Sequence, residues 1–223
     1  MQEFRTAAIH PTECFREGWQ LIKPDYWKFL GICFLGLIGG SIVPFGILLG
    51  PMLCGIYHCY LNKIAGKEVR IEQLMKGFEH FLPSFIATIL QVILLALILV
   101  PLEMLSLFGV LAKLKSGQVP TLEELAVPVL TTAFIGSILA IATALVFIFA
   151  FPLIVDKNLS AIEAMKLSAS AVFANLGGLL GLFGISILLG LIGILACYFG
   201  SLLVLPVIFA AQAIAYRKIF PQS

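Results

Sequence analysis

Residues 160–175 read SAIEAMKLSASAVFAN, a short charged phrase that directly precedes a long apolar stretch. Two earlier phrases share its order: a glutamate, a basic residue three or four places later, a small residue at the fifth place and a helix-capping residue at the twelfth. The shared positions are Glu13, Glu72 and Glu163, then Arg16, Lys76 and Lys166, then Gly18, Gly77 and Ser168, and finally Asp25, Ser84 and Asn175. A recurring phrase of this kind predicts a chain built from repeats.

The composition of the 223-residue chain indicates a membrane protein. Hydrophobic residues make up 61% of it and charged residues only 12%, with a mean hydropathy of +1.08. Soluble domains carry about 25% charged residues, so a soluble fold would have too little polar surface to cover itself. The net charge of +2 comes from dispersed basic residues interleaved with acids, and it does not indicate nucleic acid as a partner.

Four apolar runs predict the membrane spans, each of which needs roughly 20 residues. The runs cover about residues 26–61, 83–111, 126–155 and 176–216. The first and last are long enough for two spans, so we expect helical hairpins that turn near residues 39–46 and 193–200. The middle runs predict single spans. The sequence therefore predicts an all-α integral membrane protein with six transmembrane helices.

Each charged phrase predicts an amphipathic helix in the membrane interface, followed by two spans. A single membrane domain, residues 1–223, then contains repeat-like units at about residues 11–65, 70–155 and 159–218. A proline that lies 12 residues before a lysine recurs in the first and third units, at Pro51 and Pro206. In the second phrase, a period near 3.6 puts the apolar face at Ile71, Leu74, Met75, Phe78 and Leu82.

The basic residues divide unevenly between the two sides of a six-span chain. Twelve of the 14 fall on the side of both termini, and the far side keeps only Lys113 and Lys115. The positive-inside rule then predicts a multi-pass protein of the cytoplasmic (inner) membrane with both termini in the cytoplasm.

The third phrase and the run before it, FPLIVD at residues 151–156, resemble a family of uncharacterised bacterial multi-span membrane proteins. That family includes the membrane domain that precedes some glycerophosphodiester phosphodiesterases. The resemblance covers about residues 151–175 and implies a compact multi-span membrane domain without an established activity. The phosphodiesterase domain of that arrangement is absent from this chain, so its chemistry is not carried over.

The repeated acids fit the starts of helices. Glu163 lies three residues after Ser160, which is the spacing of a capping box. The alternative is a cytoplasmic ion or substrate vestibule ringed by the three repeated glutamates. At the twelfth place of each phrase we expect N-caps for the following spans, namely Asp25, Ser84 and Asn175.

Polar groups at membrane depth are few. Gln91, Glu103 and Gln212 are the groups able to line a polar pathway, although hydrogen bonding between helices is the default role of the two amides. No buried relay of carboxylates or histidines is predicted, which disfavours a proton-driven pump. Glycines four residues apart predict close helix packing in lipid, at Gly36 and Gly40 and at Gly177 and Gly181.

Signatures of catalysis, metal binding and cofactor binding are missing from the sequence. It contains no HExxH, GxxxxGK[ST] or GxSxG motif. Cys54 and His58 are four residues apart, but two ligands do not complete a zinc site. The five scattered cysteines predict free thiols. We therefore expect no enzyme activity, no metal and no cofactor.

Two classes of function stay open at the level of sequence. The first is a non-catalytic integral membrane module that packs with itself as a homo-oligomer, with membrane lipids or with another membrane protein. The alternative is a passive channel or permease for a small or amphiphilic solute. The predicted spans have hardly any polar interior, and this favours the module.

Overall fold

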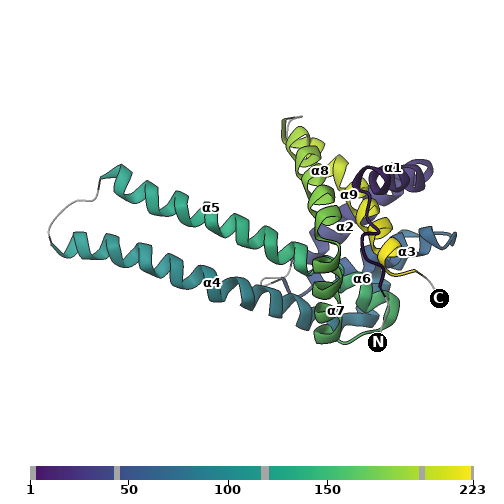
Figure 1. The fold of residues 1–223 in the computed structure, drawn as a ribbon, viewed down its shortest axis with the longest axis horizontal. Coiled ribbons are helices and arrows are strands. Elements are labelled where there is room, and N and C mark those ends of the chain that lie inside the picture. Colours follow the sequence, from purple (N-terminus) through teal and green to yellow (C-terminus); the bar gives the residue numbers. More distant parts are fainter. Residues whose placement is uncertain (1–3, 43–45, 117–120, 196–198, 222–223) are drawn as a thin grey trace. The chain divides into compact units, whose positions relative to one another are not determined.

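The computed structural model describes residues 4–42, 46–116, 121–195 and 199–221 (Figure 1). Every regular element within these ranges is a helix, and η marks a 3-10 helix. The order is α1 (Pro11–Ile22), η1 (Lys23–Asp25), α2 (Tyr26–Ile42), α3 (Leu49–Ile64), η3 (Ile71–His80), α4 (Phe81–Lys115), α5 (Leu122–Val146), α6 (Ala150–Lys157), α7 (Ala161–Ala174), α8 (Leu176–Leu195) and α9 (Phe199–Ile219). The prediction of an all-α chain is confirmed for the described residues.

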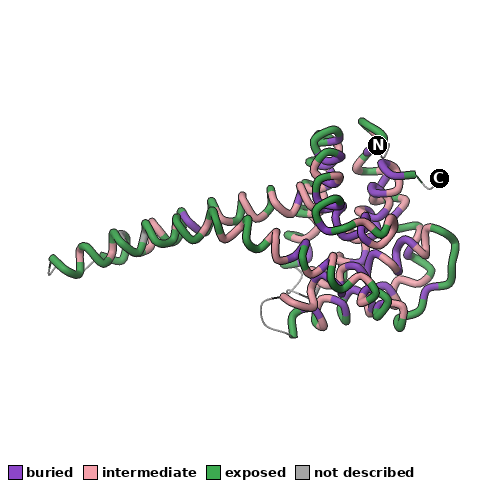
Figure 2. Tube along the Cα trace, turned by 90° about the horizontal axis from the view of Figure 1, so that it is seen from below, coloured by how far each residue is buried: buried purple, intermediate pink, exposed green. Residues whose placement is uncertain are grey.

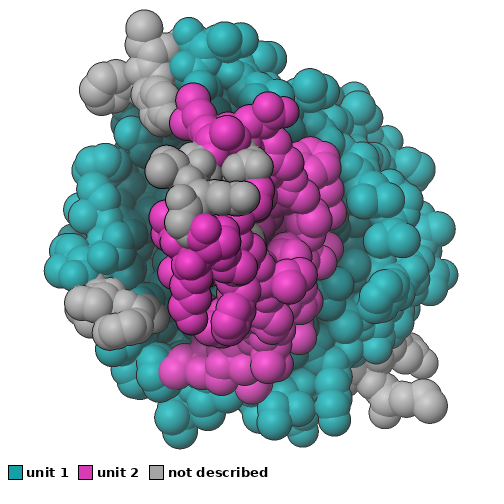
Figure 3. All heavy atoms as spheres, turned by 90° about the vertical axis from the view of Figure 1, so that its left-hand side faces the viewer, with its two compact units in different colours: residues 1–88, 145–223 teal, residues 89–144 magenta. Residues whose placement is uncertain are grey.

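The chain divides into two compact units, coloured separately in Figure 3. Unit 1 comprises residues 1–88 and 145–223, and unit 2 comprises residues 89–144. The boundaries fall inside α4 and α5, so unit 2 consists of the later part of α4 and most of α5. The predicted arrangement of three repeats within one domain is a different division, and it stays a prediction.

Helix α3 lies at the centre of unit 1. Ten of its 16 residues are buried, and it contacts α2, η3, α6 and α9. Tyr60 is fully buried, its ring centroid lies 4.7 Å from that of Phe29, and its hydroxyl donates to the Pro206 carbonyl oxygen at 2.9 Å. Figure 2 shows buried residues throughout the helices of unit 1. Aromatic and aliphatic packing around α3 therefore forms the core.

The helix ends agree with both predicted hairpin turns. Helix α2 ends at Ile42 and α3 begins at Leu49, with Gly46 between them at a φ of +67°. Glycine adopts this left-handed conformation without steric cost. In the second hairpin Gly193 of α8 lies against Ser201 of α9, and residues 196–198 of the predicted turn lie outside the described residues.

Four stretches of the described chain are long and apolar enough to cross a membrane. They are Ile71–Lys115, Leu125–Lys157, Leu176–Leu195 and Gly200–Ile219. With 17 and 16 residues, α2 and α3 are shorter. At 1.5 Å per residue they reach about 25 Å, whereas the hydrocarbon core is about 30 Å thick. These helices are compatible with an integral membrane protein, and the count of six spans stays a prediction.

The second charged phrase forms an amphipathic helix, as predicted, but the predicted period near 3.6 is wrong. It folds as the ten-residue 3-10 helix η3, which has three residues per turn. The buried residues Leu74 and Gly77 are accordingly three apart, whereas Ile71 and Met75 are exposed. The packed face of η3 is therefore narrower than the predicted face.

The predicted fourth span is interrupted. Helix α5 ends at Val146 and α6 begins at Ala150. Pro152 contributes to the break, because proline has no backbone N–H and its ring would clash with the Ile148 carbonyl of a continuous helix. The run at 126–155 is thus two helices instead of one.

Unit 2 exposes most of its large apolar side chains. Segments of α4 and α5 run antiparallel within it (Figure 1), and the Leu99 side chain lies over Gly136. Leu97, Leu105 and Phe134 are each more than two-thirds exposed. In Figure 2 both segments are mainly green, the colour of exposed residues. This surface is suited to lipid.

Candidate functional site

The small residues of the first two charged phrases pack directly on other helices of unit 1. A methyl group added at Gly18 in α1 would lie 2.9 Å from the backbone nitrogen of Ala211 in α9. A methyl group added at Gly77 in η3 would overlap the carbonyl oxygen of Pro51 and the backbone of Gly55 in α3. Only glycine allows backbones to approach this closely.

Ser168 makes a related contact for the third phrase through hydrogen bonds. Its Oγ donates to the Val146 carbonyl oxygen at 2.8 Å and accepts from the Phe149 backbone N–H at 3.2 Å. Both backbone groups flank the break between α5 and α6, where the helical hydrogen-bond ladder is interrupted. The serine hydroxyl therefore satisfies backbone groups that the break leaves without helical partners.

The three contacts follow one order along the chain. The second phrase packs on α3, the third on the α5–α6 break and the first on α9. Each partner lies late in the predicted repeat that precedes the phrase, and the first phrase packs on the last repeat. The two ends of the sequence thus meet where α1 contacts α9, a contact that we call the α1–α9 seam.

Ion pairs add to the α1–α9 seam. Lys218 Nζ lies 2.9 Å from Glu17 Oε1 and 3.4 Å from Glu13 Oε2. These glutamates are more than two-fifths exposed, so each pair stabilises the fold by at most about 1 kcal/mol. Cys14 is buried beside them, and burial raises the pKa of its thiol to about 11. The seam therefore depends mainly on close packing.

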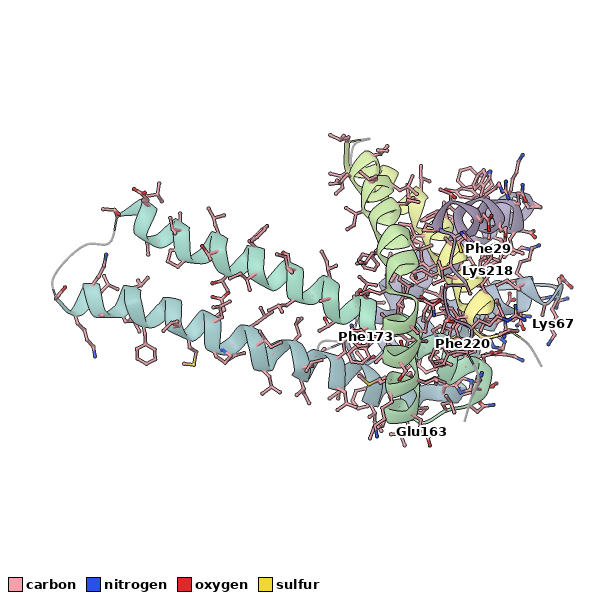
Figure 4. The ribbon with its side chains drawn as sticks, in the orientation of Figure 1. Phe29, Lys67, Glu163, Phe173, Lys218 and Phe220 are labelled. Carbon is pink, nitrogen blue, oxygen red and sulfur yellow. The ribbon has the colours of Figure 1, made fainter. Side chains whose placement is uncertain are left out.

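Glu163 forms the predicted capping box at the start of α7. Its Oε2 accepts from the Ser160 backbone N–H at 3.2 Å and from Ser160 Oγ at 2.7 Å, and its own N–H donates to Ser160 Oγ at 3.4 Å. The hydrogen bond from the serine hydroxyl lowers the pKa of Glu163. Figure 4 labels Glu163 at this end of α7 and Phe173 at the other. Glu72, the repeated acid of the second phrase, is exposed in the first turn of η3.

Of the predicted N-caps, Asp25 and Asn175 directly precede α2 and α8, whereas Ser84 does not precede a helix. Asp25 accepts a hydrogen bond from Lys63 Nζ at 2.6 Å and pairs with Lys28 at 3.1 Å, and these lysines lower the pKa of its carboxyl. Ser84 lies inside α4 and donates to the Phe81 carbonyl oxygen at 3.0 Å, so the cap predicted there is wrong. The span begins one turn earlier than the phrase suggests.

Asn175 separates α7 from α8 and binds the N-terminal segment. Its Oδ1 accepts from the Ala8 backbone N–H at 3.1 Å, and its Nδ2 donates to the carbonyl oxygens of Arg5 at 3.0 Å and Ala171 at 2.9 Å. The Arg5 N–H also donates to the Ile219 carbonyl oxygen at 2.9 Å. A buried amide thus holds both ends of the described chain together.

Asp156 is the centre of a polar cluster that the sequence did not predict. Its two carboxylate oxygens accept hydrogen bonds from the Arg217 guanidinium at 2.7 and 2.8 Å, and Oδ2 also accepts from the Tyr216 hydroxyl at 2.7 Å. The side chains of Asp156 and Arg217 are only 18% and 11% exposed. Opposite charges at the ends of two apolar runs were the available signal, but sequence does not say which ends meet.

The ion pairs of Arg217 and Lys218 lie at the end of α9, whereas the Asp25–Lys63 pair lies next in sequence to a residue that is bound near its beginning. Arg217 and Lys218 are in its last turn. The Asp25–Lys63 pair adjoins Tyr26, whose hydroxyl donates to the Leu203 carbonyl oxygen near the beginning of α9. The helix rises about 22 Å between Leu203 and Lys218.

The residues of the predicted polar pathway belong to different units. Gln212 in unit 1 accepts a hydrogen bond from the Tyr57 hydroxyl at 2.8 Å. Gln91 and Glu103 lie in unit 2. Glu103 borders an apolar groove of about 490 Å³, which is lined by Leu99, Val100, Glu103, Met104, Leu107, Val110, Leu125, Pro128 and Val129. Gln212 is therefore bound to Tyr57 within unit 1, and Glu103 borders an apolar groove within unit 2.

Of the four glycines proposed for helix packing, three lie at close contacts. A methyl group at Gly36 would meet the Ile56 side chain at 2.7 Å, one at Gly40 the Leu49 backbone at 3.1 Å, and one at Gly181 the Pro11 ring at 2.7 Å. Gly177 differs from the prediction, because no atom lies within 4 Å of the added methyl group. The close approach is at Gly178, where the Ile9 carbonyl oxygen would lie at 2.6 Å.

The described cysteines are free and buried: Cys14, Cys33, Cys54 and Cys59. Cys54 Sγ donates a long hydrogen bond of 3.9 Å to the Phe151 carbonyl oxygen. Among the described residues, no three potential metal ligands of the histidine, cysteine or carboxylate type form a cluster.

In comparisons with known proteins, no family model matches the chain, and neither a curated protein nor a solved structure matches it. The resemblance to the membrane domain of glycerophosphodiester phosphodiesterases thus stays a prediction. The apolar helices are compatible with the general class of integral membrane proteins.

Proposed function

We propose that the chain is a non-catalytic integral membrane module that packs with membrane lipids, with itself or with another membrane protein. The observation that carries this proposal is that residues of the three repeated phrases form contacts within the fold. Their small residues pack against other helices, Glu13 and Glu163 pair with Lys218 and Ser160, and Gln212 pairs with Tyr57. These polar groups, which sequence offered as candidates for chemistry, serve internal packing.

The order of the phrase contacts supports a closed arrangement of three repeats. In our proposal each phrase packs on the preceding repeat, and the α1–α9 seam joins the first repeat to the last. Such closure gives each repeat two neighbours and leaves no end repeat that needs a polar cap. The close packing between neighbouring repeats accounts for the small residue at the fifth place of each phrase.

The outer surface of α8 supports the membrane part of the proposal. Leu180, Leu188, Ile192 and Leu195 of this helix are each more than half exposed. An apolar surface of this kind needs lipid or an apolar partner. We propose the cytoplasmic (inner) membrane with both termini inside, on the basis of the uneven distribution of lysine and arginine.

A paired substitution tests the packing module. Gly18→Leu places a side chain against the Ala210 and Ala211 backbone and should abolish most of the folded, monodisperse yield in detergent. Gly184→Leu is the matched control, because open space surrounds Gly184. Equal yields for both variants would contradict the proposed role of the α1–α9 seam.

A flux assay tests the alternative function. Vesicles that contain the chain should show no more leakage of ions, small metabolites or amphiphilic dyes than empty vesicles. Solute flux that disappears in Gln91→Ala, Glu103→Ala or Gln212→Ala would overturn the module and establish a passive conduit.

A further inference from the structure

The two tryptophans of the chain lie together on the surface of unit 1. Trp19 is near the end of α1, Trp27 is in the first turn of α2, and Tyr26 lies between them. The ring centroids of Trp19 and Tyr26 are 5.7 Å apart, and those of Tyr26 and Trp27 are 5.5 Å apart, both edge to face. We call these three rings the aromatic corner.

The aromatic corner is fixed to the core and open to its surroundings. The Tyr26 hydroxyl donates to the Leu203 carbonyl oxygen at 2.6 Å and so ties the corner to α9. Trp27 is 75% exposed and Trp19 is 42% exposed. Indole rings held at a surface favour an environment that is apolar for the ring and polar for its N–H.

Three lysines are close to the aromatic corner, two of them in sequence and one through an ion pair with Asp25. Lys23 is exposed in η1, between the two tryptophans in sequence. Lys28 and Lys63 share one carboxylate, that of Asp25, at 3.1 and 2.6 Å. Two of these lysines pair with one aspartate and Lys23 is exposed, so the three lysines leave an excess of positive charge, which is complementary to an acidic surface. Exposed tryptophans beside lysines are typical of the boundary between membrane and water.

We propose that the aromatic corner binds the headgroup layer of a bilayer that contains acidic phospholipid. The indole rings lie at the boundary between headgroups and acyl chains, and Lys23 faces the lipid phosphates. This inference rests on the proposed function, since it requires the chain to be in a membrane. It also fixes the depth of η1 and of the neighbouring Leu203 region of α9.

Intrinsic fluorescence tests the depth of the corner, because Trp19 and Trp27 are the only tryptophans of the chain. The full chain is reconstituted into phosphatidylcholine and phosphatidylglycerol vesicles whose acyl chains carry bromine either near the headgroup or near the methyl end. We expect stronger quenching by the shallow bromines. Equal or stronger quenching by the deep bromines, or none by either, would overturn the inference. Flotation of the vesicles separates the two proposals, because a chain that does not float with lipid contradicts the membrane module itself.

Energy transfer from the indoles to dansyl-labelled lipid tests the choice of headgroup. Transfer to phosphatidylglycerol should exceed transfer to phosphatidylcholine, and Lys23→Gln should lower that preference by up to about fivefold. Lys166→Gln, which changes an exposed lysine of α7, is the matched control and should leave the preference unchanged. Equal transfer to both lipids in the unaltered chain would overturn the inference of an acidic headgroup.

Discussion

In unit 1 the backbones of α3 and η3 approach each other at Gly55 and Gly77, whereas in unit 2 the Leu99 side chain of α4 lies over Gly136 of α5. The helices of both units are rich in leucine, isoleucine and valine. Nevertheless α3 buries ten of its 16 residues, and most large apolar residues of unit 2 are exposed. Hydrophobicity alone therefore does not decide which helices form a core.

The difference follows from the physics of packing in lipid. Lipid tails are as apolar as leucine, so exposing a leucine to lipid costs little, and helices associate through close contact and hydrogen bonds. Unit 1 has small residues and paired polar groups at its contacts. Unit 2 presents bulky side chains, which suit a lipid-facing surface.

The largest expected effect comes from breaking the buried ion pair of unit 1. Asp156→Asn leaves the nearly buried Arg217 without its charged partner, which should lower the free energy of unfolding by about 3–5 kcal/mol. Glu103→Gln in unit 2 changes an exposed carboxyl and should cost no more than about 1 kcal/mol. Equilibrium unfolding in mixed micelles measures both, and similar losses would remove the distinction between the units.

The next effect compares one glycine from each unit. Gly77→Ala forces a methyl group into the α3 backbone and should cost about 1–3 kcal/mol of unfolding free energy. Gly109→Ala meets open space inside α4 and should be neutral or stabilise the helix by up to about 1 kcal/mol. The same micelle titration measures both variants. A neutral Gly77→Ala would show that η3 is free to shift away from α3.

A smaller effect sharpens the comparison within α8. Gly178→Ala meets the Ile9 carbonyl oxygen and should cost about 1–2 kcal/mol, because the N-terminal segment must move. Gly177→Ala has no neighbour to displace and should not destabilise the chain. Proteolysis of the N-terminal segment provides the measurement. Faster cleavage in the Gly177 variant than in the Gly178 variant would reverse the assignment.

The smallest effect is expected at the capping box of α7. Ser160→Ala removes the side-chain acceptor for the Glu163 N–H and should cost about 0.5–2 kcal/mol. Glu163→Gln should be nearly neutral, since glutamine also serves in a capping box. The free energy of unfolding in micelles checks both. If Glu163→Gln instead abolished a function without unfolding the chain, the acid would have a role beyond capping.

Local features of the fold could be predicted from sequence, because they depend on neighbouring residues. The capping box needs only Ser160 and Glu163, and the ends of the α2–α3 hairpin follow from the length of its apolar run. The break before α6 was missed although Pro152 was visible. A proline kinks many membrane helices without ending them, so its presence does not decide between one kinked helix and two separate helices.

Contacts between distant residues could not be predicted in the same way. The pairs Asp156–Arg217 and Tyr57–Gln212 require knowledge of which helix faces meet. The difference between Gly177 and Gly178 is a rotation of about 100° around α8, and a spacing of four fits several faces of an apolar helix. Within the ten residues of η3, periods of 3.0 and 3.6 share Ile71 and Leu74 and separate only at later residues, so the apolar pattern did not distinguish a 3-10 helix from an α-helix.

The α1–α9 seam has a consequence for biosynthesis. Lys218 follows Glu17 by 201 residues, and ribosomes add about 5–20 residues per second, so α1 waits roughly 10–40 s for its partner. Throughout this interval the face formed by Cys14, Gly18 and Ile22 has no α9 to cover it. A nascent chain therefore needs a temporary cover for α1, either the bilayer surface or a chaperone, until α9 has been synthesised and packs against it.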